Sequence, residues 1–131
     1  MTVRFDATLG SVLSFVICFC AAANAAPTNV GTCGPHPGWP TIQQGVNHAA
    51  AGSTVRICPG TYPEQVEVAK PLTLEGVAAG TANQAIVVSP VAGIAANTTS
   101  LSNGNPIAAQ IWVHDATAVT IQNVKMKNLD T

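Results

Sequence analysis

The chain has 131 residues, a formal net charge of −1 at pH 7, and only 8% charged residues against 47% hydrophobic ones. This length allows one domain at most. The near-neutral charge excludes the basic stripe expected of a nucleic-acid-binding protein, and no basic amphipathic helix indicates a membrane surface. We therefore expect neither nucleic acid nor, after removal of an N-terminal signal peptide, a membrane among its partners.

Residues 1–25 have the design of a secretory signal peptide. Arg4 lies near the start, an apolar run extends from Val12 to Ala23, and a small-x-small cleavage site ends at Ala25. The apolar run is shorter than the roughly 20 residues that a membrane span needs. We expect cleavage here and a secreted mature chain, in the extracellular space, at the cell surface or in a periplasm. An uncleaved anchor or a buried helix is the alternative.

Cysteine content agrees with export. Beyond residue 25 the chain keeps only Cys33 and Cys58. Two cysteines in an exported chain predict one disulfide, which stabilises a fold by about 3 kcal/mol for a loop of this size. The alternative, a metal or redox pair, needs closer spacing or further ligands. We expect no metal and no other cofactor.

The segment 26–40 is rich in proline and glycine and is predicted to be an irregular lead-in tied down by the disulfide. A helix is predicted over 41–51, because Thr41 is a suitable N-cap and Ile42 and Val46 share one apolar face. That face must be covered. The expected target is the open end of a stack of strands, whose core would otherwise face water.

Short strands follow, because apolar residues alternate with polar ones in runs bounded by glycine, proline or asparagine. The predicted strands are 54–58, 65–68, 72–75, 85–88, 110–114, 118–121 and 123–127. The expected core residues are Val66, Val68, Leu72, Leu74, Ile111, Val113, Val119 and Ile121. The long polar segment 93–106 is predicted to be a loop extruded from the strands.

An imperfect internal repeat relates two parts of the chain. The pattern of Val66–Leu74 recurs in Ile111–Ile121, 45 residues later, with Ile86–Val88 between them. A repeat of about 20 to 25 residues would place all three segments on one sheet, with parallel pairing between successive coils. A sandwich of antiparallel hairpins is the alternative. It lacks the two-residue turns expected between its strands, since the single Asn-Gly pair, Asn103–Gly104, lies in the long loop.

Four segments together resemble the N-terminal cap and first coil of right-handed parallel β-helix proteins of the pectin lyase-like superfamily. They are 42–46, 52–55, 58–66 and 70–76. The pattern Gly-x-Tyr-x-Glu at Gly60, Tyr62 and Glu64 is also similar to one near the start of pectin methylesterases. The resemblance implies an all-β fold over 41–131: a right-handed parallel β-helix, or solenoid, of about three coils with an N-terminal capping α-helix.

The resemblance implies less about chemistry, because such scaffolds carry esterases, lyases and plain surface proteins. Pectin methylesterase-like catalysis uses two aspartates and an arginine in later coils. Here the mature chain has only Asp115 and Asp130, and its single Arg56 lies in the first strand. Lyase-like chemistry uses a calcium site of clustered acids, and the sequence has no such cluster. We expect no catalytic residues in this chain.

Two functional expectations stay open. The first is an exported β-helix domain that is structural or glycan-binding, with a polysaccharide as its partner. The second is the N-terminal portion of a polysaccharide-active enzyme, pectinesterase-like or lyase-like, whose catalytic residues lie beyond Thr131. The chain is expected to be truncated, because about three coils is short for this superfamily. An open last coil would leave a bare strand edge, so we also expect self-association there.

Candidate glycan contacts lie in the strand predicted over 110–114. Trp112 and His114 share a parity opposite to that of Ile111 and Val113, so both are predicted to point outward. An outward tryptophan can stack on a sugar ring, or it can pack against the extruded loop.

Gly60, Tyr62 and Glu64 are predicted to form a structural turn. Tyr62 is expected to pack under the cap helix while its hydroxyl finds a partner. Glu64 is expected to pair with Arg56 or Lys70, or to cap backbone amides. A substrate-facing loop is the alternative reading of these three residues.

Overall fold

The computed structural model describes residues 25–80 and 84–127. All but the last residue of the predicted signal peptide lies outside the described residues, as do Asp130 and Thr131. The described part contains one helix and eleven strands: β1 (Thr28–Val30), α1 (Ile42–His48), β2 (Thr54–Ile57), β3 (Gly60–Pro63), β4 (Val66–Val68), β5 (Leu72–Gly76), β6 (Ala85–Val88), β7 (Thr98–Thr99), β8 (Pro106–Ile107), β9 (Ile111–Val113), β10 (Val119–Gln122) and β11 (Val124–Lys127).

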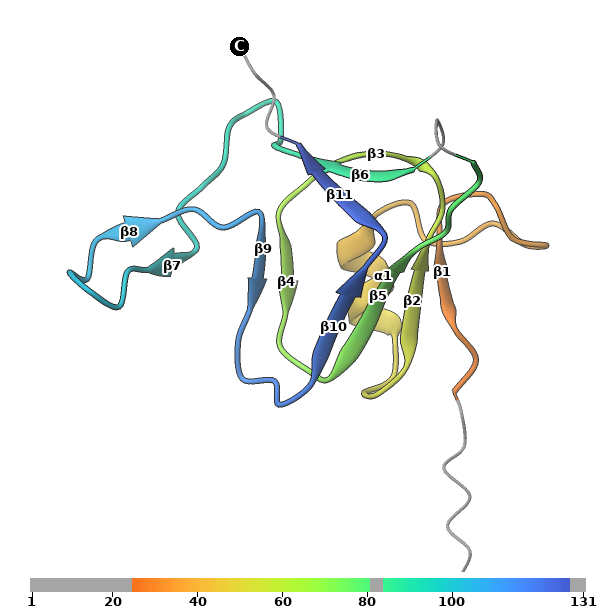
Figure 1. The fold of residues 1–131 in the computed structure, drawn as a ribbon, viewed down its shortest axis with the longest axis horizontal. Coiled ribbons are helices and arrows are strands. Elements are labelled where there is room, and N and C mark those ends of the chain that lie inside the picture. The colour runs from red at the N-terminus through yellow and green to blue at the C-terminus, as the bar shows by residue number, and fades with distance from the viewer. Residues whose placement is uncertain (1–24, 81–83, 128–131) are drawn as a thin grey trace, which may run out of the picture.

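Nine of these strands form three parallel sheets, which stand around a common interior (Figure 1). The first sheet has the order β1-β2-β5-β10, the second β11-β6-β3, and the third pairs β4 with β9. Every pairing within these sheets is parallel. The fold is therefore all-β with one helix, and parallel pairing argues against the sandwich of antiparallel hairpins.

The chain visits the three sheets in a fixed order. From β2 in the first sheet it passes to β3 in the second and β4 in the third, and β5 then returns to the first sheet beside β2. The strands β6, β9, β10 and β11 follow the same order. Inward positions stay aligned between passes, since Leu74 pairs with Val55 on one side and with Ile121 on the other.

The core lies between the three sheets and is made of the inward residues of each strand. Its fully buried members include Val55, Ile57, Val66, Val68, Leu74 and Val87, all with at most 1% of their surface exposed. Each such side chain contributes about 1.5 to 3 kcal/mol through burial. In these strands the alternation of apolar and polar residues therefore matches the alternation of buried and exposed positions.

Four expected core residues are less buried than the sequence predicts. Val113 and Ile121 are each 40% exposed, so their prediction as core residues is wrong. Ile111 and Val119 are partly buried against the core. The reason is position: β9 and β10 are the outermost strands of their sheets, so within the described ranges nothing stacks on their far side.

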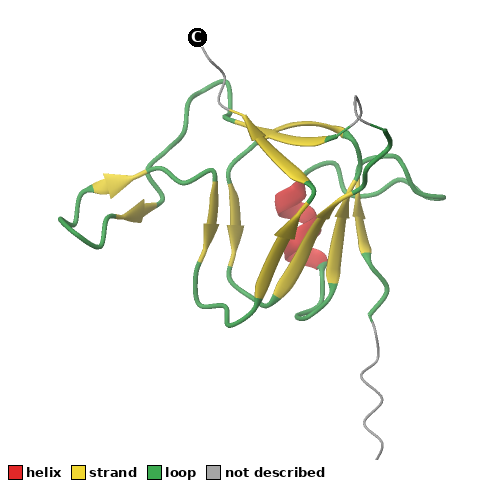
Figure 2. Cartoon of the chain, viewed as in Figure 1, coloured by secondary structure: helices red, strands yellow, loops and turns green. Residues whose placement is uncertain are grey.

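Helix α1 covers the opposite end of the interior and lies behind the strands in Figure 2. Thr41 is its N-cap, with a side chain that accepts a hydrogen bond from the Gln44 amide. Ile42 and Val46 are 1% and 2% exposed, as their spacing predicts. A Cβ at Gly45 would lie 2.4 Å from Val30 Cγ2, so glycine allows the helix to approach β1 closely. The helix ends at His48, earlier than the predicted 51.

Three further predictions are corrected by the structure. The lead-in 26–40 is not wholly irregular, because Thr28–Val30 form β1 and pair with β2. Gly60–Pro63 is strand β3 rather than a turn, and pairs with β6. The segment 86–88 lies in this second sheet, away from β4 and β9, so the three repeat segments do not share one sheet. Val66 pairs directly with Ile111, so the 45 residues between them make a single circuit of the three sheets. This circuit is long because it includes an inserted segment, the excursion.

The excursion is the segment predicted to be an extruded loop. Its strands β7 and β8 pair antiparallel and project away from the three sheets (Figure 1). Gln65 holds its base: the side-chain amide donates to the Ala95 and Ala109 carbonyls at 2.8 and 3.1 Å and accepts from the Ala95 amide at 2.9 Å. Asn97 also exchanges two hydrogen bonds with the backbone of Ala109. We call 95–109 the ribbon.

Candidate functional site

The outer face of the third sheet gathers the residues predicted to contact a glycan. The parallel register places Trp112 of β9 directly beside Glu67 of β4. Both positions alternate with inward neighbours, since Val66 and Val68 are buried on either side of Glu67. Two strands that are far apart in sequence therefore present an aromatic ring and a carboxylate on one surface.

His114 joins this surface one residue after β9. Its Nε2 lies 2.7 Å from Glu67 Oε1, and its Nδ1 lies 2.8 Å from Asp115 Oδ2. The imidazole is thus held between two carboxylates, one from the neighbouring pass of the chain and one from the next residue. Asp115 has φ 49°, a left-handed conformation that aspartate tolerates better than most residues.

The two carboxylates favour the charged form of the imidazole. The hydrogen bond to Asp115 and then that to Glu67 raise the pKa of His114 above its ordinary value of 6.5. In the protonated ring both nitrogens donate, so neither is free to accept a proton from a substrate. The two carboxylates therefore fix the orientation of the imidazole.

The imidazole of His114 in turn stacks on the tryptophan. The ring centroids of Trp112 and His114 lie 4.0 Å apart, with an angle of 23° between the ring planes. A charged imidazole against an indole face is stabilised by the quadrupole of the aromatic ring. Trp112 is half-buried, and the imidazole covers one of its faces. We call Trp112, His114, Glu67 and Asp115 the indole cluster.

A hollow of about 370 Å³ adjoins this cluster through Glu67. It lies between α1 and β4 and is lined by Gln43, Val46, Asn47, Glu67, Ala69 and Lys70. Most of these side chains carry amide, carboxylate or ammonium groups. The surface thus offers one aromatic platform with a polar depression beside it.

Tyr62 and Glu64 have structural contacts. Tyr62 is 8% exposed and its hydroxyl donates to the Cys58 carbonyl at 2.8 Å. Burial, and secondarily the charge of Glu64, raise the pKa of Tyr62 above 10.0. Glu64 accepts from the amides of Ile42 and Gln43 at 2.8 and 2.9 Å, which is the backbone-capping option among those predicted. Gly60 is exposed at the start of β3.

The disulfide between Cys33 and Cys58 is present. It joins the segment after β1 to the end of β2. Cys58 is 2% exposed, and its amide donates to the Val30 carbonyl. The bond therefore fastens the N-terminal segment to the covered end of the interior, as the sequence predicts.

Sequence reasoning missed Glu67 and Asp115 as partners of His114. The 45-residue spacing of the internal repeat could have revealed Glu67, because it places Val66 beside Ile111 and hence Glu67 beside Trp112. A second stacked pair, Trp39 on His48, was also missed. No pattern in the sequence links these two residues.

In residues 25–80 and 84–127 no group of three or more His, Cys, Asp and Glu side chains is placed to hold a metal ion. Across these same residues, no helix has the length and apolar character to cross a membrane.

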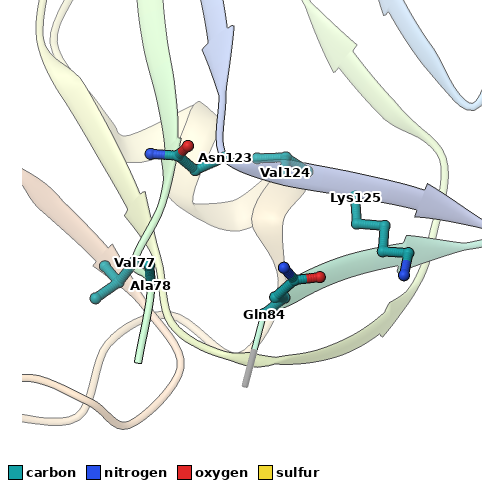
Figure 3. Close-up of a pocket in the computed structure, with 6 residues that line it drawn as sticks. All are labelled: Val77, Ala78, Gln84, Asn123, Val124 and Lys125. Carbon is teal, nitrogen blue, oxygen red and sulfur yellow. The ribbon is translucent and has the colours of Figure 1, made fainter. Parts of the chain in front are cut away.

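Another hollow, of about 470 Å³, lies at the corner between β10 and β11 (Figure 3). Its lining is Val77, Ala78, Gln84, Asn123, Val124 and Lys125, which includes no aromatic side chain. The corner is tight, because Asn123 has φ 55° and a Cβ at Gly76 would lie 2.0 Å from its carbonyl oxygen. The lining also borders residues 81–83, outside the description, so we assign this hollow no ligand.

Comparisons with protein-family models, curated proteins and solved structures found no match to this chain.

Proposed function

We propose that this chain is an exported right-handed parallel β-helix domain that binds a polysaccharide through the indole cluster. The carrying observation is Trp112, an indole fixed by His114 on the outer face of the sheet formed by β4 and β9. Its proposed pectin lyase-like character rests on the sequence resemblance of segments 42–46, 52–55, 58–66 and 70–76. Export rests on the leader pattern of residues 1–25 and on the disulfide between Cys33 and Cys58.

The cyclic order of the sheets supports the β-helix. A chain that returns to the same sheet after visiting two others, always in parallel, traces a coil. The passes β2–β4 and β5–β9, followed by the partial pass β10–β11, support a coil count of about three, with α1 as the cap. Connections between parallel strands of one sheet are right-handed in about 98% of cases, which favours the right-handed form.

The chemistry of the surface supports a sugar ligand. The C–H face of a pyranose is apolar and packs on an indole, while its hydroxyls need hydrogen-bond donors and acceptors at the edge of the ring. The hollow beside Glu67 supplies them through the side chains of Glu67 and Asn47. The Gln43 amide is already bonded to Asn47 Oδ1 and to the backbone of Glu67, and it holds this lining in place. Since Lys70 also lines the hollow, an anionic sugar has a counter-charge there.

Binding to a panel of soluble polysaccharides tests this proposal, with retardation in polysaccharide-containing native gels as the measurement. Trp112→Ala should weaken retardation, whereas Trp112→Phe should retain more of it, because phenylalanine keeps an apolar ring face. Leu101→Ala, at a fully exposed apolar position on the ribbon, is the control for loss of an apolar side chain elsewhere. Absence of retardation of the parent protein on every polysaccharide would reject glycan binding and leave a structural role for the domain.

A further inference from the structure

A separate groove lies beside β1, at the covered end of the fold. Its volume is about 560 Å³, within the range of 300–1,000 Å³ typical of small-ligand sites. Thr28, Asn29, His36, Pro37, Trp39 and Pro40 line it. None of these residues belongs to the indole cluster.

Trp39 forms a fixed wall of this groove. Its amide donates to the Asn29 carbonyl at 2.8 Å, and its carbonyl accepts from the Gly31 amide at 2.9 Å. Its indole stacks on His48 with centroids 3.8 Å apart and ring planes 3° from parallel. Because the imidazole covers one indole face, the exposure of Trp39, which is 37%, belongs to the other face and the ring edge.

The backbone behind the indole is equally constrained. Gly38 donates to the Gly31 carbonyl at 2.8 Å, and the disulfide at Cys33 anchors the same loop. A Cβ at Gly38 would lie 2.4 Å from the Asn29 carbonyl oxygen, so this close approach needs glycine. A rigid aromatic side chain loses little conformational entropy when a ligand packs on it.

The lining selects an uncharged ligand. It contains no aspartate, glutamate, lysine or arginine, and His36 is its one titratable side chain, so a charged ligand finds no permanent counter-ion there. Thr28 and Asn29 offer a hydroxyl and an amide beside the indole. Within the described residues, no hydrogen bond engages the Asn29 side chain, which leaves its donors and acceptor for a ligand.

We propose that this groove binds a sugar residue of a neutral glycan, with the pyranose stacked on the open face of Trp39 and its hydroxyls bonded to Asn29 and Thr28. The proposal shares the ligand class of the proposed function and rests on it in that respect. It adds a second site and specifies a neutral sugar. A proline-rich peptide is the competing occupant, since such peptides also dock on aromatic-lined grooves.

The two tryptophans of the chain make a direct experiment possible. In a ¹⁵N-labelled sample of the secreted chain, each indole N–H gives one resonance, and Trp112→Ala assigns the pair. The sample is titrated separately with neutral oligosaccharides (cellohexaose, xylohexaose, mannohexaose), with an acidic oligogalacturonate and with a proline-rich decapeptide.

The expected result is a saturable shift of the Trp39 resonance with a neutral oligosaccharide, retained in Trp112→Ala. Asn29→Ala should weaken this binding by about tenfold, the loss expected for one hydrogen bond, and Asn103→Ala, on the ribbon, serves as its control.

Other outcomes separate the two proposals. A shift of the Trp112 resonance alone would reject glycan binding in the groove and leave the proposed function standing. No shift of either indole overturns both. A Trp39 response confined to the peptide or to the oligogalacturonate overturns the assignment to a neutral sugar.

Discussion

Glu64 and Lys70 stand on either side of strand β4 and hold opposite ends of helix α1. The Glu64 carboxylate accepts from two amides of the first turn, at Ile42 and Gln43. The Lys70 ammonium donates to the Ala49 and Asn47 carbonyls at 2.6 and 3.2 Å. An acid at the N-terminus and a base at the C-terminus both complement the helix dipole. A seven-residue helix, too short to be stable alone, is thereby fixed over the core.

Removal of either charge should loosen this cap. Glu64→Gln and Lys70→Met should each lower the free energy of unfolding by about 1 kcal/mol. Urea denaturation of the purified variants measures the change. Glu75→Gln is the control, because Glu75 lies on the first sheet and, among the described residues, its carboxylate accepts only from Gln122, so its loss should stay within about 0.5 kcal/mol. Equal losses of unfolding free energy in Glu64→Gln and Glu75→Gln would contradict a stabilising role of Glu64 at the start of α1.

The indole cluster should make stability depend on pH. The folded state raises the pKa of His114 above 6.5, so folding is favoured by its protonation. This contribution is fully present below the unfolded pKa and is lost as pH rises through the folded pKa. His114→Gln should therefore lower the melting temperature more at about pH 5.5 than at about pH 9. Glu67→Gln, which removes one of the two carboxylates, should reduce the pH-dependent difference. A pH-independent difference would show that His114 acts only by packing.

Stability should also depend on the position of a residue in the stack. Leu74 and Ile121 are register partners, 1% and 40% exposed. Leu74→Asp buries an unpaired charge and should cost about 4 kcal/mol or more, whereas Ile121→Asp leaves its charge in reach of water and should cost about 1 kcal/mol. Chemical denaturation compares the two. Similar losses would mean that both side chains have the same surroundings.

We propose that the outermost strands mediate self-association. Val113, Ile121 and Met126 are 40%, 40% and 57% exposed on β9, β10 and β11, which are end strands of their sheets. Apolar side chains beside free strand edges favour pairing between molecules. Sedimentation velocity should show association that rises with concentration and falls in Met126→Lys. Leu101→Lys, at an equally apolar but fully exposed position on the ribbon, should change nothing. A parent protein that stays monomeric at high concentration would reject the proposal.

Much of the framework was predictable because its signals are local. Alternation around Val66 and Leu74 reports burial directly, and Thr41 carries its own capping chemistry. The disulfide was predictable from the count of cysteines. Strand β3 was not, because glycine and proline at both of its ends suggest a turn, and only pairing with β6 makes it a strand. Strand β1 was missed for the same reason: its three residues depend on β2 for their hydrogen bonds.

The site was less predictable, because it depends on register. Parity alone placed Trp112 and His114 together on the outer side of β9. Predicting that Glu67 lies across the sheet from Trp112 requires knowledge that the ribbon is inserted between β4 and β9. Trp39 and His48 meet because a loop folds back between β1 and α1, and no periodicity encodes that contact.

The clamp that Gln65 forms at the base of the ribbon has a practical consequence. Since Ala95 and Ala109 are both tied to one side chain, the chain leaves the scaffold and rejoins it at a fixed point. The ribbon between these two alanines can therefore change in length without changing the pairing of Val66 with Ile111. The tip near Asn103 is therefore a natural graft position, where a foreign epitope or a small domain can be displayed.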